Sequence, residues 1–181
     1  MKLLLGLGNH PPQYAYTRHN VGFRVLEALA QAHDAPPWRE EKQWRARLTA
    51  ITIAGEKCLL AEPTTYMNAS GQTAALLRHF YKLSERDIIA VYDDLDLPFG
   101  QLKFRQKGGP GSHNGMRSLH QHLGEDFARL KIGIGAERPA EMTGADFVLQ
   151  RFSPAEETAL PALLQQATAR LEQWVCSAAP Y

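Results

Sequence analysis

Residues 5–23, LGLGNHPPQYAYTRHNVGF, join the end of an apolar run to the start of a helical pattern. The run that begins at Lys2 is short, continuous and closed by glycines, which predicts a strand buried on both faces. Residues 21–33 place apolar side chains at helical spacing, and the loop between them contains Asn9, His19 and Asn20. Because α/β folds gather functional groups in the loops after buried strands, one titratable base among amides predicts a hydrolytic site that works without a metal.

Outward from this stretch, predicted strands alternate with predicted helices. Residues 47–53 and 57–61 flank Gly55 as in a hairpin, and residues 70–81 predict a helix with Ala74, Leu77 and Tyr81 inward. A buried strand at 87–92 ends in Asp93, and further strands are expected at 102–105 and 127–134. Helices are expected at 114–123 and at 154–175, the latter capped by Ser153. The alternation predicts an α/β sandwich around a mixed sheet.

Length and composition favour one domain spanning residues 1–181, since 181 residues with 44% apolar content suffice for one substantial core. Cys58 and Cys176 belong to no metal-binding spacing, so we expect two free thiols in a reducing cytoplasm and no structural zinc. No segment approaches the roughly 20 apolar residues of a membrane span. A soluble, cytoplasmic protein is therefore expected.

The net charge of +1 argues against a strong nucleic-acid binder, but the charges are unevenly distributed. Residues 98–131 contain six basic and two acidic side chains, a balance of +4, and residues 85–96 contain five acidic and one basic, a balance of −4. One face could therefore meet phosphates while another stays acidic, although a solvated surface explains such charges equally well.

Several motifs that would assign a cofactor or nucleophile are incomplete. Gly6 and Gly8 begin a dinucleotide fingerprint, but Pro11 stands where its third glycine belongs. The run from Gly108 to Gly111 lacks the lysine of a P-loop, although it can still expose backbone N–H groups or act as a hinge. There is no Gly-x-Ser-x-Gly elbow, and His120 and His122 point to different sides of a helix.

The remaining polar residues lie in four loops that should converge beyond the strand ends of an open sheet. Taken singly, each has a plain explanation, because asparagine and aspartate often cap turns and helices and a loop histidine is as often structural as catalytic. The candidates are Asn9, His19, Asn20, Met67, Asn68, Asp93, His113 and Asn114.

Together these segments resemble the bacterial peptidyl-tRNA hydrolase family, from Lys2 to about Gly135. The matching motifs are Gly-Leu-Gly-Asn, Tyr-x2-Thr-Arg-His-Asn-x-Gly-Phe, Pro-Thr-Thr-Tyr-Met-Asn-x-Ser-Gly, Tyr-Asp-Asp-Leu-Asp-Leu-Pro, Gly-Gly-x-Gly-x-His-Asn-Gly and Arg-Leu-Lys-Ile-Gly-Ile-Gly. The resemblance implies a monomeric α/β/α sandwich with a mixed, mostly parallel sheet. It also implies an enzyme that cleaves the ester between a peptide and the 3′ ribose of tRNA, with no metal or organic cofactor.

The resemblance assigns roles residue by residue. His19 becomes the general base and Asp93 the carboxylate that orients it, without a covalent intermediate. The resemblance also implies a mobile flap formed by His113 and the glycines before it. Substrate-binding roles fall to Asn9, Tyr14, Tyr66, Met67, Asn68, His113 and Asn114, with Asn9 a candidate oxyanion donor. Contacts to tRNA phosphates fall to Lys103, Arg105 and Lys131.

The sequence departs from the family pattern in three places. His10-Pro11-Pro12 replaces the usual Pro-Gly after Asn9, Ser112 stands where glycine is common, and the chain ends without the basic tail of many relatives. Two other functions stay open: a non-catalytic RNA-binding protein, like the plant organellar splicing proteins of this fold, and a small-molecule hydrolase or nucleotide-binding enzyme. Release of peptide from peptidyl-tRNA would distinguish the hydrolase from a non-catalytic RNA-binding protein. Competition by free tRNA would distinguish it from a small-molecule enzyme.

Overall fold

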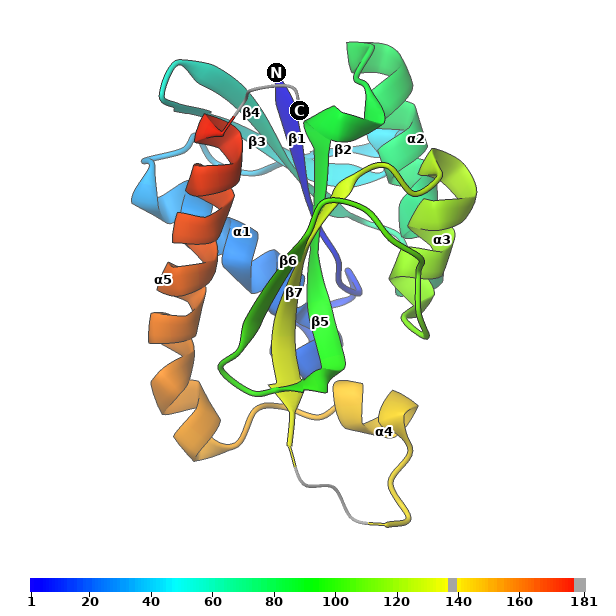
Figure 1. The fold of residues 1–181 in the computed structure, drawn as a ribbon, viewed down its shortest axis with the longest axis vertical. Coiled ribbons are helices and arrows are strands. Elements are labelled where there is room, and N and C mark those ends of the chain that lie inside the picture. Colours follow the sequence, from blue (N-terminus) through cyan, green and yellow to red (C-terminus); the bar gives the residue numbers. More distant parts are fainter. Residues whose placement is uncertain (137–139, 178–181) are drawn as a thin grey trace.

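The computed structural model describes residues 1–136 and 140–177, which form a seven-stranded sheet with helices on both faces (Figure 1). The strand order is β2-β3-β4-β1-β5-β7-β6. The four central strands are parallel, and antiparallel pairings at both edges add β2, β3 and β6. The prediction of an α/β sandwich around a mixed, mostly parallel sheet is confirmed.

The strands are β1 (Lys2–Gly6), β2 (Arg39–Glu41), β3 (Ala46–Ile53), β4 (Glu56–Pro63), β5 (Ile88–Pro98), β6 (Leu102–Arg105) and β7 (Ala128–Gly135). The helices are α1 (Val21–Ala32), α2 (Ser70–Tyr81), α3 (Asn114–Leu123), α4 (Gly144–Val148) and α5 (Pro154–Cys176). Most predicted elements agree with these bounds within two residues.

Two elements were not predicted, and one is longer than predicted. The 36–46 connection contains the short strand β2, and α4 precedes α5. The β5 strand continues past Asp93 to Pro98, with a register shift against β7 between Asp94 and Pro98. The aspartates in this segment have low strand propensity, so the sequence did not predict a strand here. Pairing with β7 supplies backbone hydrogen bonds that stabilise the strand nevertheless.

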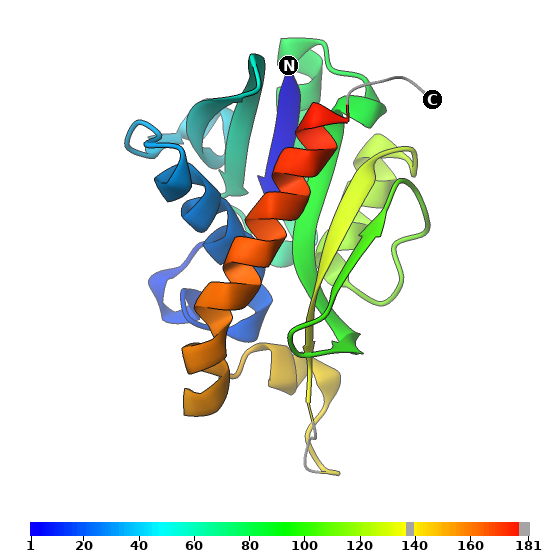
Figure 2. The same cartoon turned by 60° about the vertical axis from the view of Figure 1, so that its left-hand side comes forward.

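The core divides into two layers because the three consecutive leucines of β1, residues 3–5, are all fully buried. Leu4 packs with α1 and α5 on one face, whereas Leu3 and Leu5 pack with α2 and α3 on the other. Figure 2 shows α5 crossing the face of the sheet that it shares with α1. The continuous apolar run therefore did indicate a strand buried on both sides.

Gly22 determines how closely the His19 segment approaches the sheet. A Cβ at this position would stand 2.3 Å from the carbonyl oxygen of Val91 in β5. Only glycine permits this approach, which sets the start of α1, and the short 3-10 helix Arg18–Asn20 before it, against Val91 within β5 and the residue that follows β1.

Both thiols are free, with Cys58 buried and Cys176 exposed. Among the described residues, we find no helix with the length and hydropathy that a membrane crossing requires.

Candidate active site

A cleft of about 610 Å³ opens beyond the carboxyl ends of β1 and β4 and beside the second half of β5. It is lined by Asn9, His19, Lys131, Gly144, Ala145, Val148, Leu149 and residues 66–68, 92–96 and 110–114. The expected convergence of the four loops is thus observed, with α4 as an additional wall.

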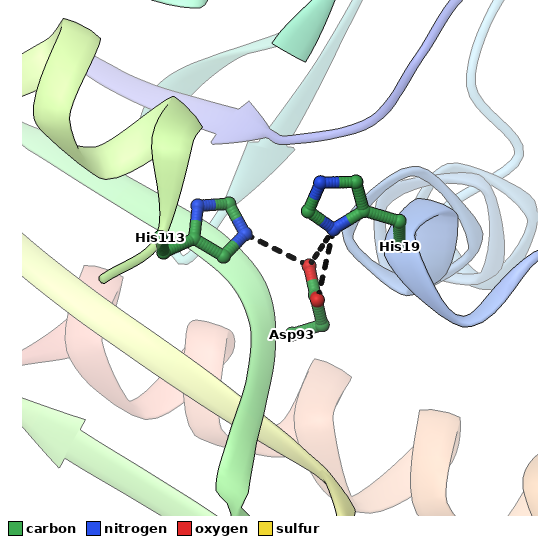
Figure 3. A group of neighbouring side chains, drawn as sticks. All are labelled: His19, Asp93 and His113. Atoms are coloured by element: carbon green, nitrogen blue, oxygen red, sulfur yellow. Dashed lines mark hydrogen bonds and ion pairs between the residues drawn. The ribbon is translucent and has the colours of Figure 1, made fainter. Parts of the chain in front are cut away.

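His19 and Asp93 form the buried centre of this cleft (Figure 3). The Nδ1 atom of His19 lies 3.0 and 2.9 Å from the two carboxylate oxygens of Asp93. Burial alone would raise the pKa of Asp93, but the His19 and His113 rings outweigh it and hold this pKa well below its usual range. The ionised carboxylate can only accept, so Nδ1 of His19 carries the proton and its Nε2 is left as a base.

His113 contacts the same carboxylate from the opposite side (Figure 3). Its Nε2 lies 2.9 Å from Asp93 Oδ1, and its Nδ1 accepts the Met116 N–H at the start of α3 at 3.3 Å. Because Nδ1 is an acceptor, the proton of the neutral ring is on Nε2 and is donated to Asp93. We did not predict this contact, and the sequence contains no signal for it, since 20 residues separate the two side chains.

His19, Asp93 and His113 also lie close enough to hold a metal, with one ligand atom each within 4.8 Å of the others. A metal-ligating histidine normally donates its second N–H to an acceptor. The second nitrogen of His113, Nδ1, instead accepts the Met116 N–H. If Nε2 bound a metal, Nδ1 would carry the proton and this hydrogen bond at the start of α3 would be lost. The hydrogen bonds of His113 therefore fit a donor to Asp93 better than a metal ligand.

Asn9 is held so that its amide NH2 group remains available. Its Oδ1 accepts the Met67 N–H at 2.9 Å, and its backbone N–H and carbonyl pair with the amide of Asn20, also at 2.9 Å. Among the described residues, Nδ2 has no hydrogen-bond partner. Asn20, whose part in the site was left open, thus fixes the position of Asn9.

The His10-Pro11-Pro12 departure does not disturb this arrangement. Pro11 has φ −55°, and Pro12 begins the short 3-10 helix Pro12–Tyr14, a place where proline's fixed φ fits. The chain turns away from the cleft after Asn9 has made its contacts.

The structure brings most of the predicted substrate-binding residues to the cleft. Met67 is buried in its wall, while Tyr66, Asn68 and Asn114 are exposed there. Tyr14 is absent from the described lining, and its carbonyl accepts the Thr17 N–H and hydroxyl within a turn. Arg129, which we did not single out as a site residue, donates to the Gly109 carbonyl at 2.8 Å in the loop before His113.

Of the three expected tRNA contacts, only Lys131 lines the cleft. Its Nζ lies 2.7 Å from Asp94 Oδ2, so an acidic partner already neutralises it. Lys103 lies opposite Lys131 on β6, and Arg105 is exposed at the same sheet edge.

An α/β sheet with a buried His–Asp pair in an open cleft, beside an amide whose NH2 group is free among the described residues, is an arrangement that can support base-assisted chemistry. The family model described as peptidyl-tRNA hydrolase matches residues 3–179. The chain belongs to the peptidyl-tRNA hydrolase family.

Individual relatives agree over most of their length. The chain is 45% identical to a peptidyl-tRNA hydrolase of Chloroflexus aggregans, covering 95% of this chain and 91% of the relative. It is 40% identical to that of Listeria welshimeri, with coverage of 96% and 93%. The crystal structure of the Acinetobacter baumannii enzyme superposes with a TM-score of 0.89 at 32% identity, covering 97% and 88%. The expectation of an enzyme of this family is confirmed.

Proposed function

We propose that this enzyme hydrolyses the ester between a peptide and the 3′ ribose of tRNA, using a water molecule activated by His19. The observation that carries the proposal is the Asp93 carboxylate beneath Nδ1 of His19, which leaves Nε2 as the free base of the cleft. Neutral imidazole is suited to accept a proton near pH 7.

The reaction needs one attack and one proton return. Water attacks the ester carbonyl carbon as its proton passes to Nε2 of His19, and Asp93 stabilises the imidazolium that forms. The tetrahedral intermediate then expels the ribose oxygen, which takes the proton back from Nε2. The products are a peptide acid and a free 3′ hydroxyl, and no step requires a metal or a covalent enzyme intermediate.

Asn9 supplies the oxyanion contact in this proposal. Because its Oδ1 is already occupied by Met67, only its NH2 group faces a substrate, and an NH2 group can donate to a developing oxyanion. Such a donor contributes about 3 kcal/mol in comparable sites. The exposed amides of Asn68 and Asn114 then suit the peptide backbone, which would allow many peptide sequences.

The test is peptide release from purified N-acetylated peptidyl-tRNA, with and without a chelator. We expect release in both conditions and competition by free tRNA. Binding without release would identify a non-catalytic RNA-binding protein. Loss of release with the chelator, restored by a metal ion, would reject the metal-free reaction, and indifference to tRNA would indicate a small-molecule hydrolase.

We also propose that Lys103 and Arg105 bind tRNA phosphates. Each alanine variant is expected to weaken tRNA binding and to reduce the slope of log affinity against log salt by about 1, because one phosphate contact is lost. Lys131→Ala should change the slope less, since Asp94 already neutralises this amine. Filter binding at several salt concentrations measures the slope, with Lys57→Ala at the exposed start of β4 as control. Unchanged low-salt affinity would remove this surface from the proposal.

A further inference from the structure

Arg18, next to the proposed base in the chain, is a buried cation held by one carboxylate and two aromatic rings, while its Nε has no hydrogen-bond partner among the described residues. Its side chain is 6% exposed, and its two terminal nitrogens donate to the two carboxylate oxygens of Glu156 at 2.8 and 2.6 Å. Its guanidinium also lies over the rings of Phe147 and Phe152, 4.4 and 4.9 Å from their centroids. This combines a bidentate ion pair with two cation–π contacts.

The Glu156 carboxylate is itself fixed at the start of α5. It accepts the Ser153 N–H at 2.7 Å in a capping box, and the Arg18 and Ser153 hydrogen bonds outweigh burial and lower the pKa of Glu156 to about 2. The pair is therefore ionised at neutral pH. Arg18 thus links the His19 turn to the first turn of α5.

The same side chain reaches the cleft wall. Phe147 belongs to α4, and Gly144, Ala145 and Val148 of this helix line the cleft together with Leu149. In addition, the backbone N–H of Arg18 donates a hydrogen bond to the Gln150 carbonyl oxygen at 2.9 Å. Figure 1 shows α4 lying beyond the end of the sheet where β5 and β7 finish, and Val148 of α4 packs against the core cluster that includes Ile132 and Ile134 of β7.

We propose that Arg18 is a positioning residue that, with Glu156, sets the distance between the α4 wall and His19. This distance determines how tightly the cleft binds the part of the substrate that lies against α4. This inference rests on the proposed function. A buried ion pair is weak evidence for stability alone, because apolar replacements of similar size are often as stable. The planar guanidinium of Arg18, between Glu156 and the rings of Phe147 and Phe152, instead fixes the orientation of α4, α5 and the His19 turn relative to one another.

The chain contains a matched control. Arg24 and Glu157 form a second two-point pair between α1 and α5, with distances of 2.9 and 3.1 Å, and no contact between this pair and α4 is found among the described residues. Exchanging either pair for apolar residues removes a two-point Arg–Glu ion pair to the first turn of α5, although the Arg24–Glu157 pair is more exposed. Only the Arg18 exchange should release the cleft wall.

The experiment compares Arg18→Met/Glu156→Leu with Arg24→Met/Glu157→Leu, using kinetics and amide hydrogen exchange. In the Arg18 pair variant we expect the KM for peptidyl-tRNA to rise about tenfold with kcat within about twofold, because uniform binding is lost. Amides of residues 144–149 should exchange faster while those of α2 do not change. The Arg24 pair variant should show neither effect. Arg18→Lys, which keeps the charge but loses the fork, tests the same point if the double variant does not fold.

Unchanged KM and unchanged exchange in residues 144–149 would overturn the proposal. A fall in kcat with unchanged KM would also overturn it, since Arg18 would then act on His19 rather than on the wall. The exchange measurement needs no catalytic activity, so it tests the position of α4 even if peptidyl-tRNA is not the substrate.

Discussion

His19→Ala should lower kcat for peptidyl-tRNA hydrolysis by about 10²–10⁴-fold while leaving the fold intact. The side chain supplies Nε2, the base of the proposed reaction, and alanine cannot accept a proton from water. The change leaves Asp93 with the His113 N–H as its hydrogen-bond donor, so the buried carboxylate keeps a partner. Single-turnover hydrolysis of purified peptidyl-tRNA measures the effect directly.

His33→Ala is the matched control for this experiment. His33 Nε2 lies 2.9 Å from Glu172, so the control removes a histidine–carboxylate pair between the residue that follows α1 and helix α5, outside the described cleft lining. Its turnover should stay within about twofold of wild type, as expected for a pair that contributes little even to stability. If His19→Ala retained near-wild-type turnover, the general-base assignment would be wrong, whatever the control shows.

The sequence predicted the sheet and its main helices well because their signals are local. The apolar run of β1, the capping serine of α5 and the amphipathic pattern of α2 each specify an element without help from distant residues. The end of β5 and the strand β2 were missed because pairing with β7 and β3 stabilises them. Tertiary contacts override propensity at such positions.

The site likewise has features that local motifs predict and features that depend on long-range contacts. His19, Asp93 and Asn9 could be named from motifs and their resemblance to a family, and the structure places them together in one cleft. The second histidine on Asp93 and the Arg18–Glu156 pair depend on contacts across 20 and 138 residues, which no local pattern encodes. The sequence can therefore show which residues form the site, but how their side chains are oriented depends on how whole helices and strands pack together.

Asp93→Asn should lower kcat by about 10³–10⁴-fold, by analogy with the same change in serine-protease triads. His113 can only donate to residue 93, because Met116 occupies its other nitrogen. The amide oxygen of asparagine would therefore face His113, and its NH2 group would face His19. Nδ1 of His19 must then accept, which moves its proton to Nε2 and removes the base without removing the ring. A pH–rate profile beside Asp126→Asn, an exposed aspartate paired with Arg86, measures the loss.

The stability of Asp93→Asn should separate this tautomer effect from a damaged fold. The folded pKa of Asp93 is depressed, so its ionised form stabilises the protein above the unfolded value of about 3.9, and this contribution is lost as pH falls through the lower folded pKa. Wild type should therefore exceed the variant in free energy of unfolding at pH 7, and the difference should shrink at pH 3. A variant that is folded at pH 7 yet inactive supports the tautomer argument. One that keeps near-wild-type kcat at pH 7 contradicts it, because Nε2 of His19 would then be a base without the Asp93 carboxylate.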